Sequence, residues 1–279
     1  MTAAAGPARR GAAVLGSPIS HSLSPVLHRA AYDALGLADW TYRAIECISD
    51  RLHDTLRGLD TERLAGVSLT MPLKRTVVPM LATVDTVAAT VGAANTVIFR
   101  DDGWHGANTD VLGMVAALRP HLSGTQAGSR AAILGAGATA ASAIAAAANL
   151  GFSGVAVFAR RPSAARELEG LAANLDLGVD VLGWEHLATA ADHPLVIATT
   201  PADSTQALAT AIAATPGLLF DVIYSPWPTP LAAAWQAGGG RVVGGLELLT
   251  EQAALQVHLM TGLPASVDVM REAGYAALH

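Results

Sequence analysis

The chain has 279 residues, of which 52% are hydrophobic and 14% are charged, and its formal net charge is −6 at pH 7. This composition supports a large buried core and excludes a disordered chain. The chain is acidic overall and has no basic cluster, so we expect no nucleic-acid partner. No apolar run approaches the roughly 18–20 residues of a membrane span, so we expect no membrane partner.

Other features of the composition indicate a cytoplasmic protein. The single cysteine, Cys47, excludes an internal disulfide and fits a reducing compartment. The N-terminal residues carry Arg9 and Arg10 but lack the long apolar region of a secretory signal. The nine histidines do not take the spacing of a metal site, so no metal is expected. Composition leaves open whether the protein is a monomer or a homodimer.

Strand-like and helix-like segments alternate along the first half, which predicts an α/β fold with parallel strands. Residues 12–16 predict a buried strand, and residues 24–36 predict a helix with Ser24 as its cap and Pro25 in its first turn. Further strands are expected at 40–47 and 65–72, and a hairpin at 92–110 with its turn at Asp101, Asp102 and Gly103.

The stretch before the first helix carries more polar side chains than one cap requires. Ser22 and His21 precede Ser24. Two interpretations are open. The segment is an ordinary capped helix with polar loop residues, or its hydroxyls and the helix N-terminus hold an anion.

The second half begins a new pattern near Arg130. Residues 130–151 read as a strand, a glycine turn and an alanine-rich helix. Further strands are expected at 154–161, 194–201, 217–226 and 240–245, and a helix at 246–262. We therefore predict two domains. A nucleotide-type domain spans 111–245, and the first domain consists of residues 1–110 together with the C-terminal helices 246–279.

The glycine turn at 135–140 (GAGATA) follows an apolar strand and opens a helix, which is the context of a dinucleotide site. Gly135 permits the tight turn, and Gly137 lets the backbone approach a pyrophosphate. Ala136, Ala138 and Thr139 complete the loop and the first helical turn, where free N–H groups favour phosphate. The alternative is a turn that merely needs small residues.

The residues after the next strand favour NADP over NAD. An NAD site usually has an acidic residue there, whereas this chain has Arg160 and Arg161. Guanidinium groups suit a 2′-phosphate because their planar donors engage two oxygens at once. The alternative is that both arginines are plain solvated charge.

Seven short segments follow one another in a specific order. They are SHSLSP (20–25), TMPLK (70–74), GAANT (92–96), GANTD (106–110), GAGATA (135–140), DVIYSPWPTPL (221–231) and GGLELLTEQA (244–253). This series resembles the shikimate dehydrogenase family over nearly the whole chain. The resemblance implies NADPH-dependent reduction of 3-dehydroshikimate to shikimate, in the pathway to chorismate and aromatic amino acids. It also implies an N-terminal α/β substrate domain, a Rossmann-type NADP domain and a cleft between them.

The resemblance also implies roles for individual residues. Lys74 and Asp110 are implied as the catalytic pair. Ser22 and Ser24 would bind the substrate carboxylate, Tyr224 would lie near that end, and Thr70, Asn95, Asp110 and Gln252 would line the ring hydroxyls. Val222, in the DVIY segment, and Gly245 would lie near the nicotinamide. His21 and His28 have no such role and are interpreted as structural.

Two departures from the family pattern bear on the alternatives. Ser68 stands where the family commonly has Asn, and Ala159, Arg160 and Arg161 stand where it has Asn-Arg-Thr. An NAD-dependent quinate/shikimate dehydrogenase, an aminoshikimate relative and a non-catalytic NADP-binding sensor remain alternatives. The missing acidic residue disfavours the first, and the presence of both Lys74 and Asp110 disfavours the last.

Overall fold

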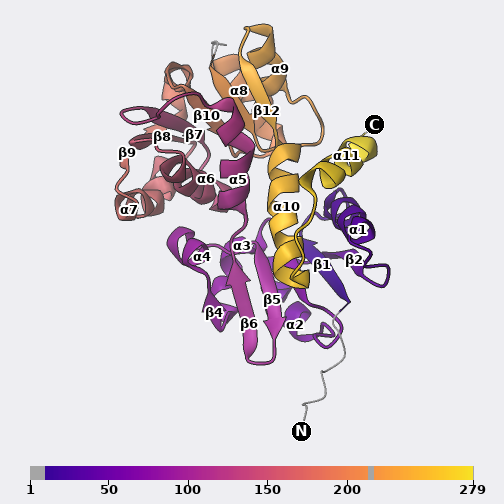
Figure 1. Ribbon diagram of the computed structural model, residues 1–279. Helices are drawn as coiled ribbons and strands as arrows, with labels where there is room; N and C mark the ends of the chain where they lie inside the picture. The colour runs from indigo at the N-terminus through magenta and orange to yellow at the C-terminus, as the bar shows by residue number, and fades with distance from the viewer. Residues whose placement is uncertain (1–9, 213–216, 279) are drawn as a thin grey trace. The chain divides into compact units, whose positions relative to one another are not determined.

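The computed structural model describes residues 10–212 and 217–278 (Figure 1). Residues 1–9, part of the stretch in which no secretory signal is expected, lie outside the described residues. The chain divides into two compact units. The first runs up to Thr109 and takes in the chain from Gln252 onward, and the second comprises Asp110–Glu251.

The first unit contains a mixed six-stranded sheet in the order β2-β1-β3-β5-β6-β4. Its strands are β1 (Gly11–Gly16), β2 (Thr41–Glu46), β3 (Gly66–Leu69), β4 (Thr83–Val84), β5 (Thr96–Arg100) and β6 (Gly103–Ala107). β1 pairs in parallel with β2 and β3, whereas β5 runs antiparallel to β3 and β6. The expected strands and the hairpin are confirmed, although β3 ends at Leu69, before the expected Pro72.

Short helices and 3-10 turns connect these strands. They are α1 (Ser24–Ala34), η1 (Ser49–Arg51), α2 (Leu52–Arg57), α3 (Leu73–Thr76), η2 (Val78–Met80), α4 (Thr86–Val91) and α11 (Val267–Leu278). α1 packs against α11 (Figure 1). Helix α10 (Gly245–Thr261) contains the boundary between the units. A core around Leu15, Val67 and Phe99 fills one side of the sheet.

The second unit contains an all-parallel sheet in the order β12-β11-β10-β7-β8-β9. Its strands are β7 (Arg130–Leu134), β8 (Gly154–Ala159), β9 (Gly178–Gly183), β10 (Leu195–Ala198), β11 (Leu218–Asp221) and β12 (Arg241–Gly244). Counted from β7, the order is that of a Rossmann sheet, so the predicted fold class is confirmed. β9 was not expected, because this edge strand has two glycines and an aspartate among its six residues and therefore gives a weak strand signal.

Helices connect these parallel strands. They are α5 (Asp110–Leu118), η3 (Arg119–His121), α6 (Ala138–Asn149), η4 (Pro162–Ala165), α7 (Arg166–Asn174), η5 (Trp184–Asp192), η6 (Ala202–Ser204), α8 (Thr205–Ala211) and α9 (Pro230–Ala237). A core that includes Phe158, Leu219 and Trp235 packs on one side of the sheet. The strand order reverses between β7 and β10, which is where ligands bind in such sheets. Among the described helices, none has the length and apolarity needed to cross a membrane.

Candidate functional site

Four segments of the first unit meet at one edge of its sheet. β1 and β3 are parallel and end there, antiparallel β5 begins there, and β6 ends there. The backbone contacts follow from this register. Ser17 N–H donates to the Met71 carbonyl at 2.9 Å, Ala94 N–H donates to the Lys74 carbonyl at 2.8 Å, and Leu69 N–H donates to the Asn95 carbonyl at 2.7 Å. The sheet therefore gathers the loops that carry most of the predicted substrate residues.

Asn95 is the centre of a buried polar cluster at this edge. Its side chain is 1% exposed, and its Nδ2 donates to Thr109 Oγ1 at 2.8 Å and to Gln252 Oε1 at 3.3 Å. Its Oδ1 accepts from the Thr109 N–H at 2.9 Å. The structure thus brings together Asn95 and Gln252, two residues predicted from widely separated motifs.

A second layer of hydrogen bonds supports Asn95 and contains residues that sequence reasoning missed. Gln256 Nε2 donates to Thr96 Oγ1 at 3.1 Å, and Thr96 Oγ1 donates to Asn95 Oδ1 at 2.9 Å. Ser68, in the position where the family commonly has Asn, donates to Gln256 Oε1 at 2.7 Å and accepts from the Tyr42 hydroxyl at 2.7 Å. Only the pairing of β1 with β2 and β3, together with the packing of α10, could have indicated Tyr42 and Gln256.

Thr70 and Lys74 lie in the turn that follows β3. Leu73 N–H donates to the Thr70 carbonyl at 2.8 Å, and the short helix α3 then carries the half-buried Lys74. Asp110 follows Thr109 directly in the chain, is 4% exposed and opens α5 in the second unit. The catalytic pairing of Lys74 with Asp110 stays a prediction.

The prediction that Ser24 caps α1 is wrong. Ser24 is the first residue of the helix, and the capping position belongs to Leu23, whose side chain makes no cap hydrogen bond. Ser22 Oγ instead accepts from the Ser24 N–H at 3.3 Å, because a serine hydroxyl readily reaches the amide two residues on. The hydroxyl of Ser24, 6% exposed, makes no hydrogen bond within the described part of the chain. It is therefore available to a ligand at the N-terminus of α1.

His28 is fully buried on α1, whereas His21 is exposed. The His28 ring stacks on Tyr42 with centroids 3.8 Å apart, and its Nδ1 lies 2.9 Å from the Ser24 carbonyl. Burial lowers the pKa of His28 to about 4, so the ring is neutral at pH 7 and Nδ1–H is the donor to that carbonyl. His28 is a core residue that supports the segment carrying Ser24.

The loop between β7 and α6 has the geometry of a phosphate cradle. Gly135 has φ +119°, and a Cβ there would lie 2.5 Å from Thr199 Oγ1, so only glycine fits. Exposed Gly137 precedes α6 without a side-chain cap, and a Cβ there would meet nothing within 4 Å. Buried Thr200 Oγ1, beside Gly135, has no hydrogen-bond partner among the described residues. Ala136, Ala138 and Thr139 are half-buried. These features fit a pyrophosphate.

Arg160 and Arg161 follow β8 and are both exposed. The guanidinium carbon of Arg160 lies 5.4 Å from the ring centroid of Trp184, which begins η5. Trp184 directly follows β9, a strand that sequence reasoning missed. The end of β8, where dinucleotide-binding sheets of this type usually carry an acidic residue for NAD, therefore has two cations and no acidic residue.

The segment that carries Val222 and Tyr224 is tied at both ends by one buried carboxylate. Asp221 Oδ1 accepts from the Ile223 N–H at 3.1 Å, and Oδ2 accepts from Thr229 Oγ1 at 2.6 Å. Thr229 Oγ1 in turn accepts from the Ala232 N–H at 3.0 Å and caps α9. Burial raises the pKa of Asp221. No sequence pattern indicated these hydrogen bonds of Asp221 and Thr229, which together form a clasp around the segment.

Gly245 is packed directly against this segment. Its N–H donates to the Ile223 carbonyl at 3.1 Å, and a Cβ would lie 2.1 Å from the Val222 carbonyl oxygen. The structure thus brings together Val222 and Gly245, both predicted near the nicotinamide. Gly245 opens α10, and Gln252 follows about two turns later on the same helix.

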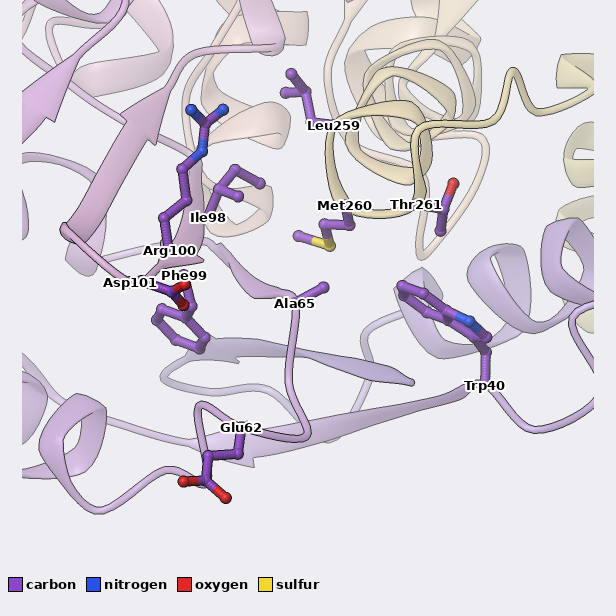
Figure 2. Close-up of a pocket in the computed structure, with 10 residues that line it drawn as sticks. All are labelled: Trp40, Glu62, Ala65, Ile98, Phe99, Arg100, Asp101, Leu259, Met260 and Thr261. Atoms are coloured by element: carbon purple, nitrogen blue, oxygen red, sulfur yellow. The ribbon is translucent and has the colours of Figure 1, made fainter. Parts of the chain in front are cut away.

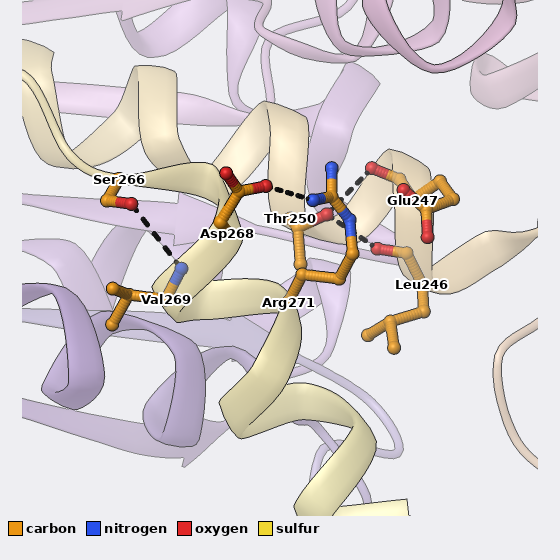
Figure 3. Close-up of polar contacts among 7 residues, drawn as sticks. All are labelled: Leu246, Glu247, Thr250, Ser266, Asp268, Val269 and Arg271. Atoms are coloured by element: carbon orange, nitrogen blue, oxygen red, sulfur yellow. Dashed lines mark hydrogen bonds and ion pairs between the residues drawn. The ribbon is translucent and has the colours of Figure 1, made fainter.

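Buried Thr250 is satisfied within the first part of α10. Its Oγ1 donates to the carbonyls of Leu246 and Glu247, each at 3.0 Å (Figure 3). Within α11, Asp268 pairs with Arg271, and the Val269 N–H donates at 3.4 Å to Ser266 Oγ, just before the helix. These contacts stabilise the helices themselves.

A hollow of about 670 Å³ lies elsewhere on the first unit (Figure 2). Its lining residues are Trp40, Glu62, Ala65, Ile98, Phe99, Arg100, Asp101, Leu259, Met260 and Thr261. Ala65 precedes β3 and Arg100 ends β5, so the hollow is at the ends of β3 and β5 opposite to the ends that adjoin Lys74 and Asn95. None of the predicted site residues lines it. No group of three or more metal-ligating side chains is found in the described ranges.

Two protein-family models match the chain. The model described as the shikimate dehydrogenase substrate binding domain matches residues 14–97, and the model described as the shikimate 5′-dehydrogenase C-terminal domain matches residues 245–273. The first match contains Ser22, Ser24, Thr70, Lys74 and Asn95, and the second contains Gly245 and Gln252.

Curated relatives match almost the full length. The NADP(+) shikimate dehydrogenase of Microcystis aeruginosa is 34% identical over 271 residues, which is 93% of this chain and 94% of the relative. That of Citrifermentans bemidjiense is 34% identical over 96% of this chain and 95% of the relative. These matches include the second unit.

Solved structures agree. The Mycobacterium tuberculosis shikimate dehydrogenase has a TM-score of 0.87 at 40% identity, and the similarity covers 95% of this chain and 99% of that one. The Thermus thermophilus shikimate 5-dehydrogenase, crystallised with NADP(H) and shikimate, has a TM-score of 0.78 at 30% identity, over 96% and 100% of the two chains.

Proposed function

Because the chain belongs to the shikimate dehydrogenase family, we propose that it catalyses the NADPH-dependent, reversible reduction of 3-dehydroshikimate to shikimate. The observation that carries this proposal is the similarity to NADP(+) shikimate dehydrogenases over 93% or more of the chain. The first unit is then the substrate domain, and the second unit is the NADP domain.

The substrate residues belong to the edge of the first sheet. Ser22 and Ser24 bind the carboxylate at the N-terminus of α1, where helix dipole and free N–H groups favour an anion. Thr70, Asn95 and Gln252 hold the ring hydroxyls. The hydrogen bond between Asn95 and Gln252 fixes both amides before substrate arrives, and buried amides left unpaired penalise a ring without matching hydroxyls. Tyr224 contributes at the carboxylate end.

Lys74 and Asp110 are the proposed catalytic pair. The nicotinamide supplies the hydride to the ketone carbon when NADPH is bound. Negative charge then grows on the ketone oxygen, and the Lys74 ammonium donates a hydrogen bond and finally a proton to it. Asp110 orients the Lys74 ammonium by attraction between opposite charges. In the reverse direction Lys74 accepts the proton from the shikimate hydroxyl.

The cofactor residues belong to the carboxyl end of the second sheet. The backbone from Gly135 to Thr139 holds the pyrophosphate, and Arg160 and Arg161 hold the 2′-phosphate. Val222 and Gly245 line the nicotinamide. The cradle at Gly137 and the orphan hydroxyl of Thr200 support this assignment.

We also propose that the enzyme works in the cytoplasm as a monomer or homodimer, without nucleic-acid or membrane partners. The net charge of −6 and the single cysteine support this. Size-exclusion chromatography with light scattering distinguishes the two assembly states.

A steady-state assay of the purified protein tests the proposed reaction. Shikimate and quinate are each oxidised with NADP⁺ and with NAD⁺, and the four kcat/KM values are compared. We expect the shikimate and NADP⁺ combination to be fastest. A preference for quinate with NAD⁺ would assign the chain to quinate/shikimate oxidation, and no turnover with any pair would support a non-catalytic NADP-binding protein.

A further inference from the structure

Arg160 and Trp184 are neighbours because β8 and β9 are paired in parallel. Phe158 lies opposite Leu182, and Ala159 lies opposite Gly183. One step further along both strands, the guanidinium carbon of Arg160 lies 5.4 Å from the centroid of the Trp184 ring. That distance is within the range of a cation–π interaction, for which tryptophan offers the strongest ring face.

Trp184 is anchored, whereas Arg160 reaches into solvent. The Trp184 ring is half-buried and packs against the core of the second unit that includes Phe158. Its buried Nε1–H has no hydrogen-bond partner among the described residues, so donation to another protein group does not explain the tryptophan. Arg160 is exposed and has no ion pair within the described ranges, so no carboxylate there neutralises its charge.

We propose that Trp184 is a positioning residue for cofactor selection, which holds the Arg160 guanidinium ready for the 2′-phosphate of NADP. The inference rests on the proposed function, because it deepens the assignment of Arg160. A free arginine loses much side-chain freedom when it binds a phosphate. Stacking on a fixed ring removes part of that freedom beforehand and leaves the in-plane N–H donors open to phosphate oxygens.

The expected effect is modest and specific for the 2′-phosphate. A cation–π contact at a partly exposed site corresponds to about a two- to fivefold change in affinity. NAD⁺ lacks the 2′-phosphate, so its affinity should not depend on the orientation of Arg160. The ratio of the two affinities therefore separates positioning from a general effect on the fold, which would weaken both cofactors.

The test compares Trp184→Leu with Trp184→Phe, which keeps a smaller aromatic ring face and removes the unpaired N–H. Isothermal titration calorimetry measures binding of adenosine 2′,5′-bisphosphate and of adenosine 5′-monophosphate, and steady-state kinetics measures KM for NADP⁺ and NAD⁺. We expect Trp184→Leu to weaken the bisphosphate and NADP⁺ by about two- to fivefold. The monophosphate, NAD⁺ and kcat should be unchanged, and Trp184→Phe should retain at least half of the selectivity.

A double-mutant cycle with Arg160→Ala completes the test. In that background Trp184→Leu should have no further effect on bisphosphate binding. Equal losses for both nucleotides, or the same loss with and without Arg160, would overturn the proposal. Trp184→Met provides a second non-aromatic variant if Trp184→Leu does not fold. Since calorimetry needs no turnover, a protein that fails to oxidise shikimate would refute the proposed reaction while the binding data still decide the role of Trp184.

Discussion

The Tyr42 hydroxyl donates a 2.7 Å hydrogen bond to Ser68 Oγ, and Ser68 in turn donates to Gln256 Oε1. The Ser68 hydroxyl therefore accepts one hydrogen bond from β2 and donates another to α10. Ser68→Ala leaves two buried partners unsatisfied, whereas Tyr42→Phe leaves only one acceptor on Ser68 without its donor. A buried polar group without a partner costs about 1–3 kcal/mol.

We accordingly predict that Ser68→Ala lowers the free energy of unfolding by more than Tyr42→Phe, and that it raises KM for shikimate by loosening Asn95. Urea unfolding and steady-state kinetics measure the two effects. A loss for Tyr42→Phe that exceeds the loss for Ser68→Ala would contradict this order of hydrogen bonds.

Lys74→Met should lower kcat far more than it raises KM for shikimate. A positioned general acid–base contributes about 10²–10⁴-fold to the rate, which corresponds to roughly 3–5 kcal/mol of barrier. Arg75→Met, which removes the exposed cation next in the chain, is the matched control and should leave kcat near wild type. More than a third of wild-type kcat in Lys74→Met would make Lys74 a binding or surface residue.

Arg160→Ala should weaken NADPH binding about ten- to a hundredfold with little change for shikimate, because a charge-assisted hydrogen bond contributes roughly 1.5–3 kcal/mol. The double variant with Arg161→Ala should lose more affinity for NADPH than either single variant, since either arginine can partly replace the other. Fluorescence titration with NADPH and NADH measures the loss. Equal damage to both cofactors would show that the arginines support the fold instead.

The stability of the protein should fall as the pH is lowered from about 6.5 to about 4, in part through His28. Burial lowers its folded pKa to about 4 from an unfolded value of 6.5, so the neutral ring contributes stability above pH 6.5 that is lost as the pH falls through the folded pKa. The shift corresponds to about 3 kcal/mol. Thermal unfolding of His28→Phe, which keeps the stack on Tyr42, should show a flatter profile. If His28→Phe lost stability with falling pH as steeply as the wild type, His28 would be excluded as a source of this pH dependence.

Thr229→Val should destabilise the protein by about 2–4 kcal/mol, because it removes both the cap of α9 and a hydrogen bond to the buried Asp221 carboxylate. It should also raise the pKa of Asp221 further, since the Thr229 hydrogen bond lowers that pKa. Thr229→Ser keeps the hydroxyl and should stay near wild type. Differential scanning calorimetry at pH 7 compares the two, and equal melting temperatures would remove the clasp as a source of stability.

The sequence predicted the elements that carry strong local signals. The strand, glycine turn and alanine-rich helix at β7 and α6 were predicted because the turn needs Gly135 and the helix needs its small residues. The hairpin of β5 and β6 was marked by its turn residues. β9 was missed because it is an edge strand in which glycine and aspartate occupy half of the positions.

The candidate site was predicted less completely. Asn95 and Gln252 were found by resemblance, and the structure brings them together. Sequence reasoning did not find Tyr42, Gln256 or Thr229, because their roles depend on partners in other elements. Ser24 was taken as the cap of α1, whereas the hydrogen bond to the Ser24 amide comes from Ser22. Serines two residues apart offer the same chemistry, and only the backbone geometry selects between them.

By itself, the sequence determined the features that depend on a residue and its immediate neighbours. These include the glycine turn at Gly135, the two arginines at the end of β8, and the absence of an acidic residue beside them. The tertiary structure alone decided which distant side chains meet. Strand register places Arg160 against Trp184, and packing in the first unit aligns Tyr42 with Ser68. The reason is physical: a turn or a cap is fixed by local backbone energetics, whereas a contact between strands appears only when the register is fixed by the whole core.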